Sequence, residues 1–304
     1  MNEFIPLLIL ESHVFLRNLL IILLILIIFA LLCYILFNSI AKKLKVKRVT
    51  FYENSSERDN FKFIFISDLH INCLPVDRRK IVSEIAAESP DFIVFTGDFA
   101  HSDEEKYKKE SLDFFASLID AAACPIYITY GNHDIRDFFS SDRLKRDAFT
   151  MALTDISPRI RVLENTYEIF RKNGSSIVIG GLNDITENES GGKDLCAKWK
   201  NIADSENARF MTISHNPDIL LTLGDDFADF FLAGHTHAGQ IRLPFHAEFK
   251  ILRMHDKLPC RGIYYGKTVF NNVPIYITSG LGCSILPIRF GTYPEIVLIE
   301  TGMK

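Results

Sequence analysis

The longest apolar segment of the chain is residues 18–37, NLLIILLILIIFALLCYILF, a run of 20 residues without a charge. At about 1.5 Å per residue, a helix of this length crosses a hydrocarbon core of about 30 Å. A buried helix normally alternates with polar positions, but this run is apolar on every face. It is longer than the h-region of a signal peptide, and no small-residue cleavage site follows it. The pattern predicts a transmembrane helix at 18–37, preceded by a short N-terminal segment at 1–17.

The flanks of this run predict its orientation. Five basic residues follow the run: Lys42, Lys43, Lys45, Lys47 and Arg48. Before the run stand Arg17 and two acidic residues, Glu3 and Glu11. The positive-inside rule therefore predicts a single-pass protein of the inner (cytoplasmic) membrane, with residues 61–304 as a cytoplasmic domain. Residues 38–60 are predicted to be a basic juxtamembrane segment and linker, with membrane lipid as a partner.

Strand and helix patterns alternate in the first half of the domain. Residues 61–67, 92–96 and 125–129 have the apolar character of buried strands, whereas 76–88 and 104–122 have helical spacing. Further strands are predicted with little helix between them, at 176–180, 209–214, 228–233, 274–278 and 295–300. Early alternation followed mostly by strands predicts an α/β domain in which two sheets pack together with helices outside.

Composition excludes some classes of protein. The chain has 34 basic and 38 acidic residues, a net charge of -4, which argues against a nucleic-acid partner. Its six cysteines are scattered and form no CxxC pair, which favours free thiols over a disulfide framework. No feature of the sequence implies a protein partner.

Polar residues of ligand type follow five of the predicted strands. They occur in the motifs Ser67-Asp68-Leu69-His70, Thr96-Gly97-Asp98, Gly131-Asn132-His133-Asp134, Ser214-His215-Asn216 and Gly234-His235-Thr236-His237. Ligands of open α/β sheets gather beyond the carboxyl ends of strands, and residues two apart in extended chain point to the same side. A single Asp or His of this kind is more often a cap or a core group, but five such ends in order predict one shared metal site. Donors of O and N type suit Mn²⁺, Fe²⁺ or Zn²⁺.

In this order, the motifs DLH, GD, GNHD, SH and GHTH resemble those of the calcineurin-like metallophosphoesterases, from about Phe61 to the C-terminus. GHTHAGQ and SGLGCSILPIRFGTYPEI are similar to the membrane-associated bacterial branch of that family. The resemblance implies a four-layer α-β-β-α sandwich of two mixed sheets. It also implies a phosphoester hydrolase that holds two divalent ions, and we favour Mn²⁺ as their identity. A hydroxide activated by the ions would be the nucleophile.

The resemblance also implies roles for individual residues. One ion would be bound by Asp68, His70, Asp98 and His237. The other would be bound by Asp98, Asn132, His215 and His235, so that Asp98 bridges the two. His133 would act on the leaving-group side. Many members carry Asp where this chain has His101, so the partner that orients His133 is open; Asp134 is one candidate, although a turn role for it is the alternative.

A narrower likeness concerns the substrate. SDLHIN, PDFIVFTGDF and the N-terminal anchor look like the UDP-2,3-diacylglucosamine pyrophosphatases of lipid A biosynthesis. This likeness predicts an acylated sugar nucleotide as the phosphoester substrate. One alternative is a general membrane-anchored phosphodiesterase or phosphatase. A non-catalytic metal-containing scaffold is a remote alternative, because every ligand position and His133 are filled.

Residues 136–149, RDFFSSDRLKRDAF, follow GNHD and combine aromatic with basic side chains. One hypothesis is a lid in which Phe138 and Phe139 hold acyl chains while Arg143 and Arg146, with Lys145, meet phosphate. The alternative is an amphipathic surface helix packed on the core. The sequence leaves both open.

Overall fold

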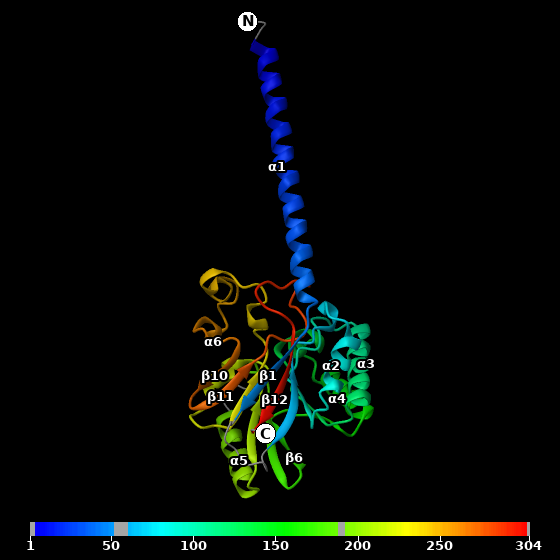
Figure 1. The fold of residues 1–304 in the computed structure, drawn as a ribbon, viewed down its shortest axis with the longest axis vertical. Coiled ribbons are helices and arrows are strands. Elements are labelled where there is room, and N and C mark those ends of the chain that lie inside the picture. The colour runs from blue at the N-terminus through cyan, green and yellow to red at the C-terminus, as the bar shows by residue number, and fades with distance from the viewer. Residues whose placement is uncertain (1–3, 52–59, 188–191, 303–304) are drawn as a thin grey trace.

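The computed structural model describes residues 4–51, 60–187 and 192–302 of the chain. Its first element is α1 (Phe4–Ala41), a single helix that projects from the folded domain (Figure 1). Helix α1 begins and ends outside the predicted span, and residues 4–17 belong to it. Among the described residues, the segment Val14–Ala41 of this helix is long enough and apolar enough to cross a membrane.

The first sheet has six strands in the order β1-β12-β2-β3-β4-β5. Their bounds are β1 Lys45–Phe51, β12 Glu295–Thr301, β2 Phe61–Ile66, β3 Ile93–Phe95, β4 Ile126–Ile128 and β5 Ile160–Val162. Strands β2 to β5 are parallel, whereas β12 is antiparallel to β2 and parallel to β1. The sheet is therefore mixed, as expected.

The second sheet also has six strands, in the order β10-β11-β9-β8-β7-β6. Their bounds are β10 Gly266–Phe270, β11 Val273–Ile277, β9 Phe230–Ala233, β8 Arg209–Ile213, β7 Ser175–Gly181 and β6 Thr166–Lys172. The four inner strands are parallel and the two edge strands are antiparallel to their neighbours. Inner strands covered on both faces explain the unbroken apolar runs in the sequence.

The two sheets pack face to face through an apolar core. Phe51 of β1 stacks on Phe230 of β9, and Phe63 and Phe65 of β2 lie in the same buried cluster. Helices cover the outer faces: α2 Arg78–Ala87, α3 Glu105–Ala122 and α4 Arg143–Ile156 on the first sheet, and α5 Gly192–Ser205 on the second. The expected four-layer α-β-β-α sandwich is confirmed.

The chain enters the first sheet soon after α1, which corrects the predicted linker. Residues 45–51 form β1, in register with 295–301. Val49 and Phe51 are buried while Lys45 and Lys47 are exposed, the alternation of a strand with one covered face. The basic residues concealed this pattern in the sequence. Residues 52–59 of the predicted linker lie outside the described residues.

This connection determines where α1 stands. Because β1 runs antiparallel to β2, the first residue of β1 lies at the edge where β2, β3 and β4 end. Helix α1 therefore leaves the domain at the carboxyl edge of the parallel strands. Figure 1 shows α1 joining that end of the domain. Several short helical turns occupy the same edge: η2 Ile71–Cys73, η3 Asp134–Phe138, η4 Pro217–Thr222, η5 His237–Gly239, η6 Pro244–His246, η7 Glu248–Leu252 and α6 Lys257–Cys260.

Candidate metal centre

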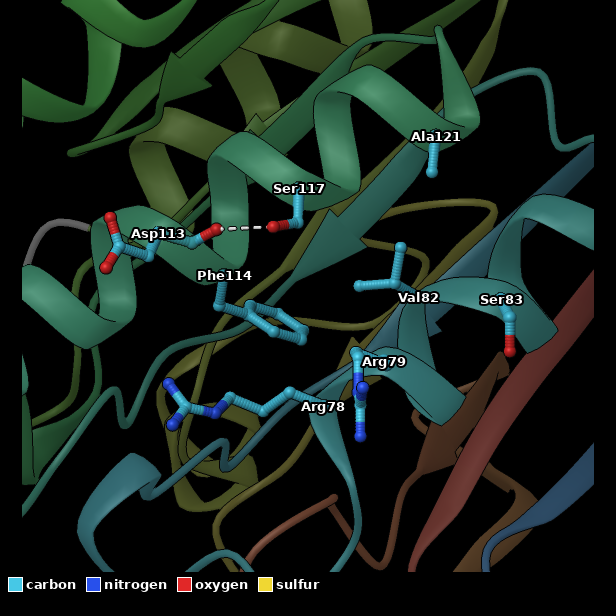
Figure 2. A pocket seen from close by; sticks show the side chains of 8 residues that line it. All are labelled: Arg78, Arg79, Val82, Ser83, Asp113, Phe114, Ser117 and Ala121. Carbon is cyan, nitrogen blue, oxygen red and sulfur yellow. Dashed lines mark hydrogen bonds between the residues drawn. The ribbon is translucent and has the colours of Figure 1, made fainter.

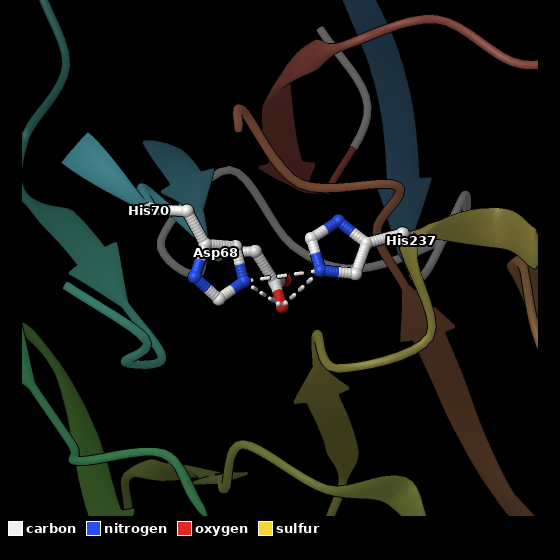
Figure 3. Close-up of side chains that lie close together, drawn as sticks. All are labelled: Asp68, His70 and His237. Atoms are coloured by element: carbon white, nitrogen blue, oxygen red, sulfur yellow. Dashed lines mark hydrogen bonds and ion pairs between the residues drawn. The ribbon is translucent and has the colours of Figure 1, made fainter. Parts of the chain in front are cut away.

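The structure brings the seven predicted donors together where five strands end. Asp68 and His70 follow β2, Asp98 follows β3, Asn132 follows β4, His215 follows β8, and His235 and His237 follow β9. The donors form two groups, and within each group the ligand atoms lie within 4.8 Å of one another. The first group is Asp68, His70 and His237, and the second is Asp68, Asp98 and His215. Figure 3 shows the first group, in which the two imidazoles turn toward the carboxylate between them.

Close approach of the strand ends requires glycine at two positions and accompanies positive φ angles at two of the donors. A side chain at Gly131 would collide with Asp98 and His215, and one at Gly234 would collide with Ser67 and Asp68. Only glycine lets the strand ends approach this closely. Asp68 and Asp98 themselves have positive φ angles of 52° and 61°. Such angles are uncommon for non-glycine residues and often occur at functional sites.

The first donor group consists of neutral imidazoles facing a carboxylate. The Nε2 atoms of His70 and His237 lie 3.1 Å apart, and Nε2 of His237 lies 3.5 Å from Oδ1 of Asp68. Burial holds the pKa of both imidazoles well below the ordinary value, so both rings are neutral. Two neutral nitrogens that lie together beside a carboxylate fit a shared cation, and the buried Nδ1 atoms of both rings have no hydrogen-bond partner among the described residues.

His215 belongs to the second group, and His235 and Asn132 lie beside it. Nε2 of His215 lies 3.1 Å from Oδ2 of Asp98, while Nδ1 faces the carbonyl oxygen of Thr96 at 2.7 Å. The Thr96 contact fixes the ring so that Nε2 faces the other donors and would be the atom that binds an ion. Nδ1 of His235 lies 3.0 Å from Oδ1 of Asn132 and 3.3 Å from His215. These donors fit a second ion beside the first.

Asp98 belongs to the second group and also contacts a donor of the first. Its Oδ2 is 3.5 Å from Nε2 of His70 and 3.1 Å from Nε2 of His215. Burial alone raises the pKa of Asp98, but attraction to His215 and a hydrogen bond from it outweigh burial and hold the pKa well below the ordinary value. A charged carboxylate in this position suits the bridging role that the family resemblance implies.

His133 is oriented by Asp137, a residue that the sequence analysis missed. Nδ1 of His133 lies 2.5 Å from Oδ2 of Asp137, because the turn η3 brings the fourth residue after His133 beside it. Burial alone raises the pKa of Asp137, but hydrogen bonds from Arg136 and His133 hold it below the ordinary value. The i, i+4 spacing of His133 and Asp137 was the available signal.

Asp134, the predicted candidate for this role, has the turn function instead. Its buried carboxylate accepts backbone N–H bonds from Asp98, Phe99 and Gly131, at 2.7, 2.6 and 2.8 Å. It thereby joins the ends of β3 and β4.

The ring of His101 packs between those of His70 and His133, with centroids 3.9 Å from each, and burial lowers the pKa of His101 to about 4.

Asp256 and Arg253 form a second support that the sequence did not indicate. Oδ1 of Asp256 lies 3.2 Å from Nε2 of His235, and Arg253 forms an ion pair with Asp256 at 2.7 Å and donates to the carbonyl oxygen of His235 at 3.1 Å. These contacts leave Nδ1 of His235 facing Asn132. Both residues come from an irregular segment about twenty residues after the histidine, without a recognisable motif.

The predicted lid is wrong. Phe138 and Phe139 are 0% and 1% exposed and pack around Phe99 and Phe149 in the core. They are therefore unavailable to acyl chains, and the core-packing alternative is correct.

The basic residues of the predicted lid are already paired. Arg146 is buried and bonds Glu187 at 2.7 Å, and Arg143 pairs with Asp147 at 2.8 Å and with Glu164 at 3.0 Å. Lys145 pairs with Asp103.

A cleft of about 550 Å³ opens beside the metal donors. Asn132 and His235 line its inner end, and three basic side chains, Arg136, His255 and Lys257, line it further out. Three carboxylates, Glu187, Asp218 and Asp256, line the same cleft, so its wall is of mixed charge. Arg136 and Ser141 of the segment 136–149 line this wall, whereas Phe138, Phe139, Arg143 and Arg146 do not.

A second hollow, of about 430 Å³, lies between α2 and α3 (Figure 2). Its wall combines the apolar side chains of Val82 and Phe114 with those of Arg78 and Arg79, and Ser117 donates to the carbonyl oxygen of Asp113. None of its lining residues is a predicted site residue, so it is separate from the metal centre.

Comparison with known proteins gives the family. Residues 61–239, more than half of the chain, match the family described as "Calcineurin-like phosphoesterase". The chain belongs to this family. Together with the donor set, membership makes the protein a metal-dependent phosphoester hydrolase.

Three curated relatives illustrate the range of the family. "Uncharacterized metallophosphoesterase YkoQ" of Bacillus subtilis is 25% identical over 85% of this chain and 91% of its own length. "Phosphodiesterase YaeI" of Escherichia coli is 26% identical, with coverages of 83% and 86%. "UDP-2,3-diacylglucosamine pyrophosphatase LpxG" of Chlamydia trachomatis is also 26% identical, with coverages of 79% and 83%.

Proposed function

We propose that this metallophosphoesterase hydrolyses a phosphoester of a membrane-embedded substrate, with UDP-2,3-diacylglucosamine as the leading candidate. The observation that carries the proposal is topological. The metal donors and the end of α1 lie at the same edge of the first sheet, because β1 starts where β2 ends. An apolar helix at that edge would hold the donors close to the bilayer in which an acylated substrate resides.

The roles of the residues follow from their positions. Two divalent ions held by these donors, Mn²⁺ for preference, supply an activated water and neutralise charge on the phosphoryl group. Asp98 keeps the two donor groups together. His133 delivers a proton to the leaving oxygen, and Asp137 holds its ring in the required orientation. His133 also donates its backbone N–H to Oδ1 of Asp98, which fixes its distance from the donors.

Two features support a sugar-nucleotide pyrophosphate. The cleft beside the donors carries Lys257 and Arg136, whose side chains can reach a second phosphate. A relative of similar identity and coverage is named for cleavage of UDP-2,3-diacylglucosamine. The second candidate function is a general phosphodiesterase, which the similarity to the Escherichia coli relative favours.

We expect UDP-2,3-diacylglucosamine to be cleaved to UMP and 2,3-diacylglucosamine 1-phosphate, and UDP-sugars without acyl chains to be cleaved far more slowly. The physical reason is the enrichment of acylated substrate in the surface to which α1 holds the enzyme. Rates are compared at equal concentration in mixed micelles, with products identified by mass spectrometry. Equal rates, or cleavage of an aryl phosphodiester alone, would favour the general phosphodiesterase.

We also propose that the domain lies on the cytoplasmic side of an inner membrane, because basic residues such as Lys42 and Lys43 follow the helix. A reporter fused after Lys304 is expected to be active only if it is one that works in the cytoplasm. The same fusion after replacement of the five basic residues by Gln serves as the comparison. Activity of a periplasmic reporter on the unmodified chain would reverse the orientation.

A further inference from the structure

Large apolar side chains are exposed at the edge of the domain where α1 leaves it. Seven residues form this group, called here the apolar rim: Leu243, Phe245, Ile251, Met254, Ile285, Leu286 and Phe290. Phe245 is 89% exposed and Ile285 is 85% exposed. Figure 1 shows their segments, yellow to orange around 244–254 and red around 282–293, at the end of the domain next to α1. Exposed apolar residues are common singly, but a group of this kind marks an interaction surface.

The rim is one connected structure. The backbone N–H of Arg242 donates to the carbonyl oxygen of Phe290, and the N–H of Phe290 donates to that of Gln240, each at 2.9 Å. The side-chain amide of Gln240 donates to the carbonyl oxygens of Ser284 and Leu286. The two segments that carry the rim are therefore held together, so their apolar tips face outward as a unit.

The rim is also fixed to the end of α1. The ring of Phe290 lies 4.8 Å from that of Phe37, and Asn38 donates from its side chain to the carbonyl oxygen of Pro287 at 2.7 Å. The backbone N–H of Arg289 donates to the carbonyl oxygen of Phe37 at 3.1 Å. These contacts make the rim continuous with the apolar surface of the helix.

Backbone strain supports a functional reading of the tips. Ile285 has a φ of 63° and Phe245 a φ of 58°. A left-handed conformation is unfavourable for a β-branched residue, and such strain is retained mainly where it has a use. Here it directs an isoleucine and a phenylalanine into solvent at the end of the molecule nearest to α1.

We propose that the apolar rim is a second contact with the lipid bilayer, dipping into the head-group region beside α1. The proposal rests on the proposed membrane anchoring of the chain. Continuity with α1 identifies the bilayer as the occupant, since a helix that crosses a membrane brings this edge to its surface. Lys250 and Arg242 flank the apolar tips, and Lys42 and Lys43 follow the helix, so anionic head groups suit the same surface.

The rim connects the bilayer to the metal centre. Arg253 and Asp256, the two residues that hold His235, flank Met254 of the rim in the sequence. Gln240 follows the donor His237 by three residues. A bilayer contact at the tips would therefore hold the mouth of the site at head-group level, where the phosphate of an amphiphilic substrate lies.

The test uses a single added tryptophan in the full chain, reconstituted in vesicles that contain anionic lipid. The native chain has one tryptophan, Trp199, which is buried against β7 and serves as the common background. Phe245→Trp carries the probe at the rim. Val269→Trp is the matched control, because Val269 is 62% exposed and pairs with the start of β11, away from the donor edge.

We expect the added emission of Phe245→Trp to shift to shorter wavelength and to be lost when the lipids carry brominated acyl chains. Emission of Val269→Trp should remain unshifted and unquenched. Equal behaviour of the two variants, in chains that float with the vesicles, overturns the rim contact while leaving the anchor intact. Chains that do not float with vesicles overturn both.

A second measurement separates this inference from the proposed function. Phe245→Ser combined with Ile285→Ser should slow hydrolysis of a bilayer-embedded phosphoester and leave the rate on a water-soluble aryl phosphodiester unchanged. Equal loss on both substrates would assign the rim to folding and contradict the proposal. A chain that hydrolyses no phosphoester refutes the proposed function, yet the quenching result still decides whether the rim contacts lipid.

Discussion

Phosphoester hydrolysis is expected to stop when divalent ions are removed from the purified chain by a chelator, and to return best with Mn²⁺. The donors leave few alternatives, because His70 and His237 are neutral, face one another and lie beside carboxylates. The ions contribute several kcal/mol of charge stabilisation, so their loss should slow the reaction by about a thousandfold or more. Turnover at the full rate in metal-free protein would contradict the metal centre.

Asp98→Ala should reproduce the effect of the chelator by mutation. Asp98 lies within 3.5 Å of donors in both groups, so its removal weakens both ion positions at once. Metal content measured by elemental analysis should fall below two ions per chain. Asp155→Ala is the control, because Asp155 is an exposed residue of α4, away from the donors. An Asp98→Ala chain with two ions and normal turnover would exclude a bridging role.

His133→Asn is expected to lower kcat by about 10²–10⁴-fold, the range typical of a group that transfers a proton in the transition state. Metal content should remain at two ions, because His133 lies outside both donor groups. Steady-state kinetics and elemental analysis on the same preparation measure the two quantities. A loss of metal together with activity would instead assign His133 to the metal centre.

Asp137→Asn tests how His133 is held. Partners that orient a functional histidine typically contribute about 10–100-fold, so a loss of that size in kcat is expected with little change in KM. The same change made in a His133→Asn background should have almost no further effect, because the two residues act as one unit. Equal losses in both backgrounds would mean that Asp137 acts independently of the histidine.

The sequence predicted much of the fold because its strongest signals are local. An uncharged run of 20 residues can form only an apolar helix, and buried parallel strands require unbroken apolar runs. The donor motifs were equally clear, since each follows a strand and parallel strands end at one edge. β1 escaped prediction because its alternation, with Val49 and Phe51 facing the core, is carried by a segment rich in lysine.

Within the site, the sequence predicted the candidate donors that the structure brings together, and the tertiary structure decided what supports them. Asp134 and Asp137 are the same residue type, and both closely follow His133 in the sequence. A helical turn brings Asp137 beside His133, whereas Asp134 accepts a hydrogen bond from the backbone at the end of a neighbouring strand. Asp256 reaches His235 across an irregular segment that no periodicity describes. Contacts between segments distant in sequence depend on packing in three dimensions and leave no pattern along the chain.

The burial of Phe138 and Phe139, the aromatic pair after GNHD, likewise depended on the tertiary structure. An amphipathic segment buries its apolar side against whatever surface the fold offers, and the sequence alone does not say whether that surface is lipid or core. Phe138 and Phe139 meet Phe99 and Phe149, so they are core. The apolar residues left exposed, Phe245 among them, lie instead in irregular loops without periodicity. The sequence determined the apolar helix, most of the strands and the motifs that carry the candidate donors. Only the tertiary structure decided which apolar side chains remain free, because exposure depends on every other segment that packs nearby.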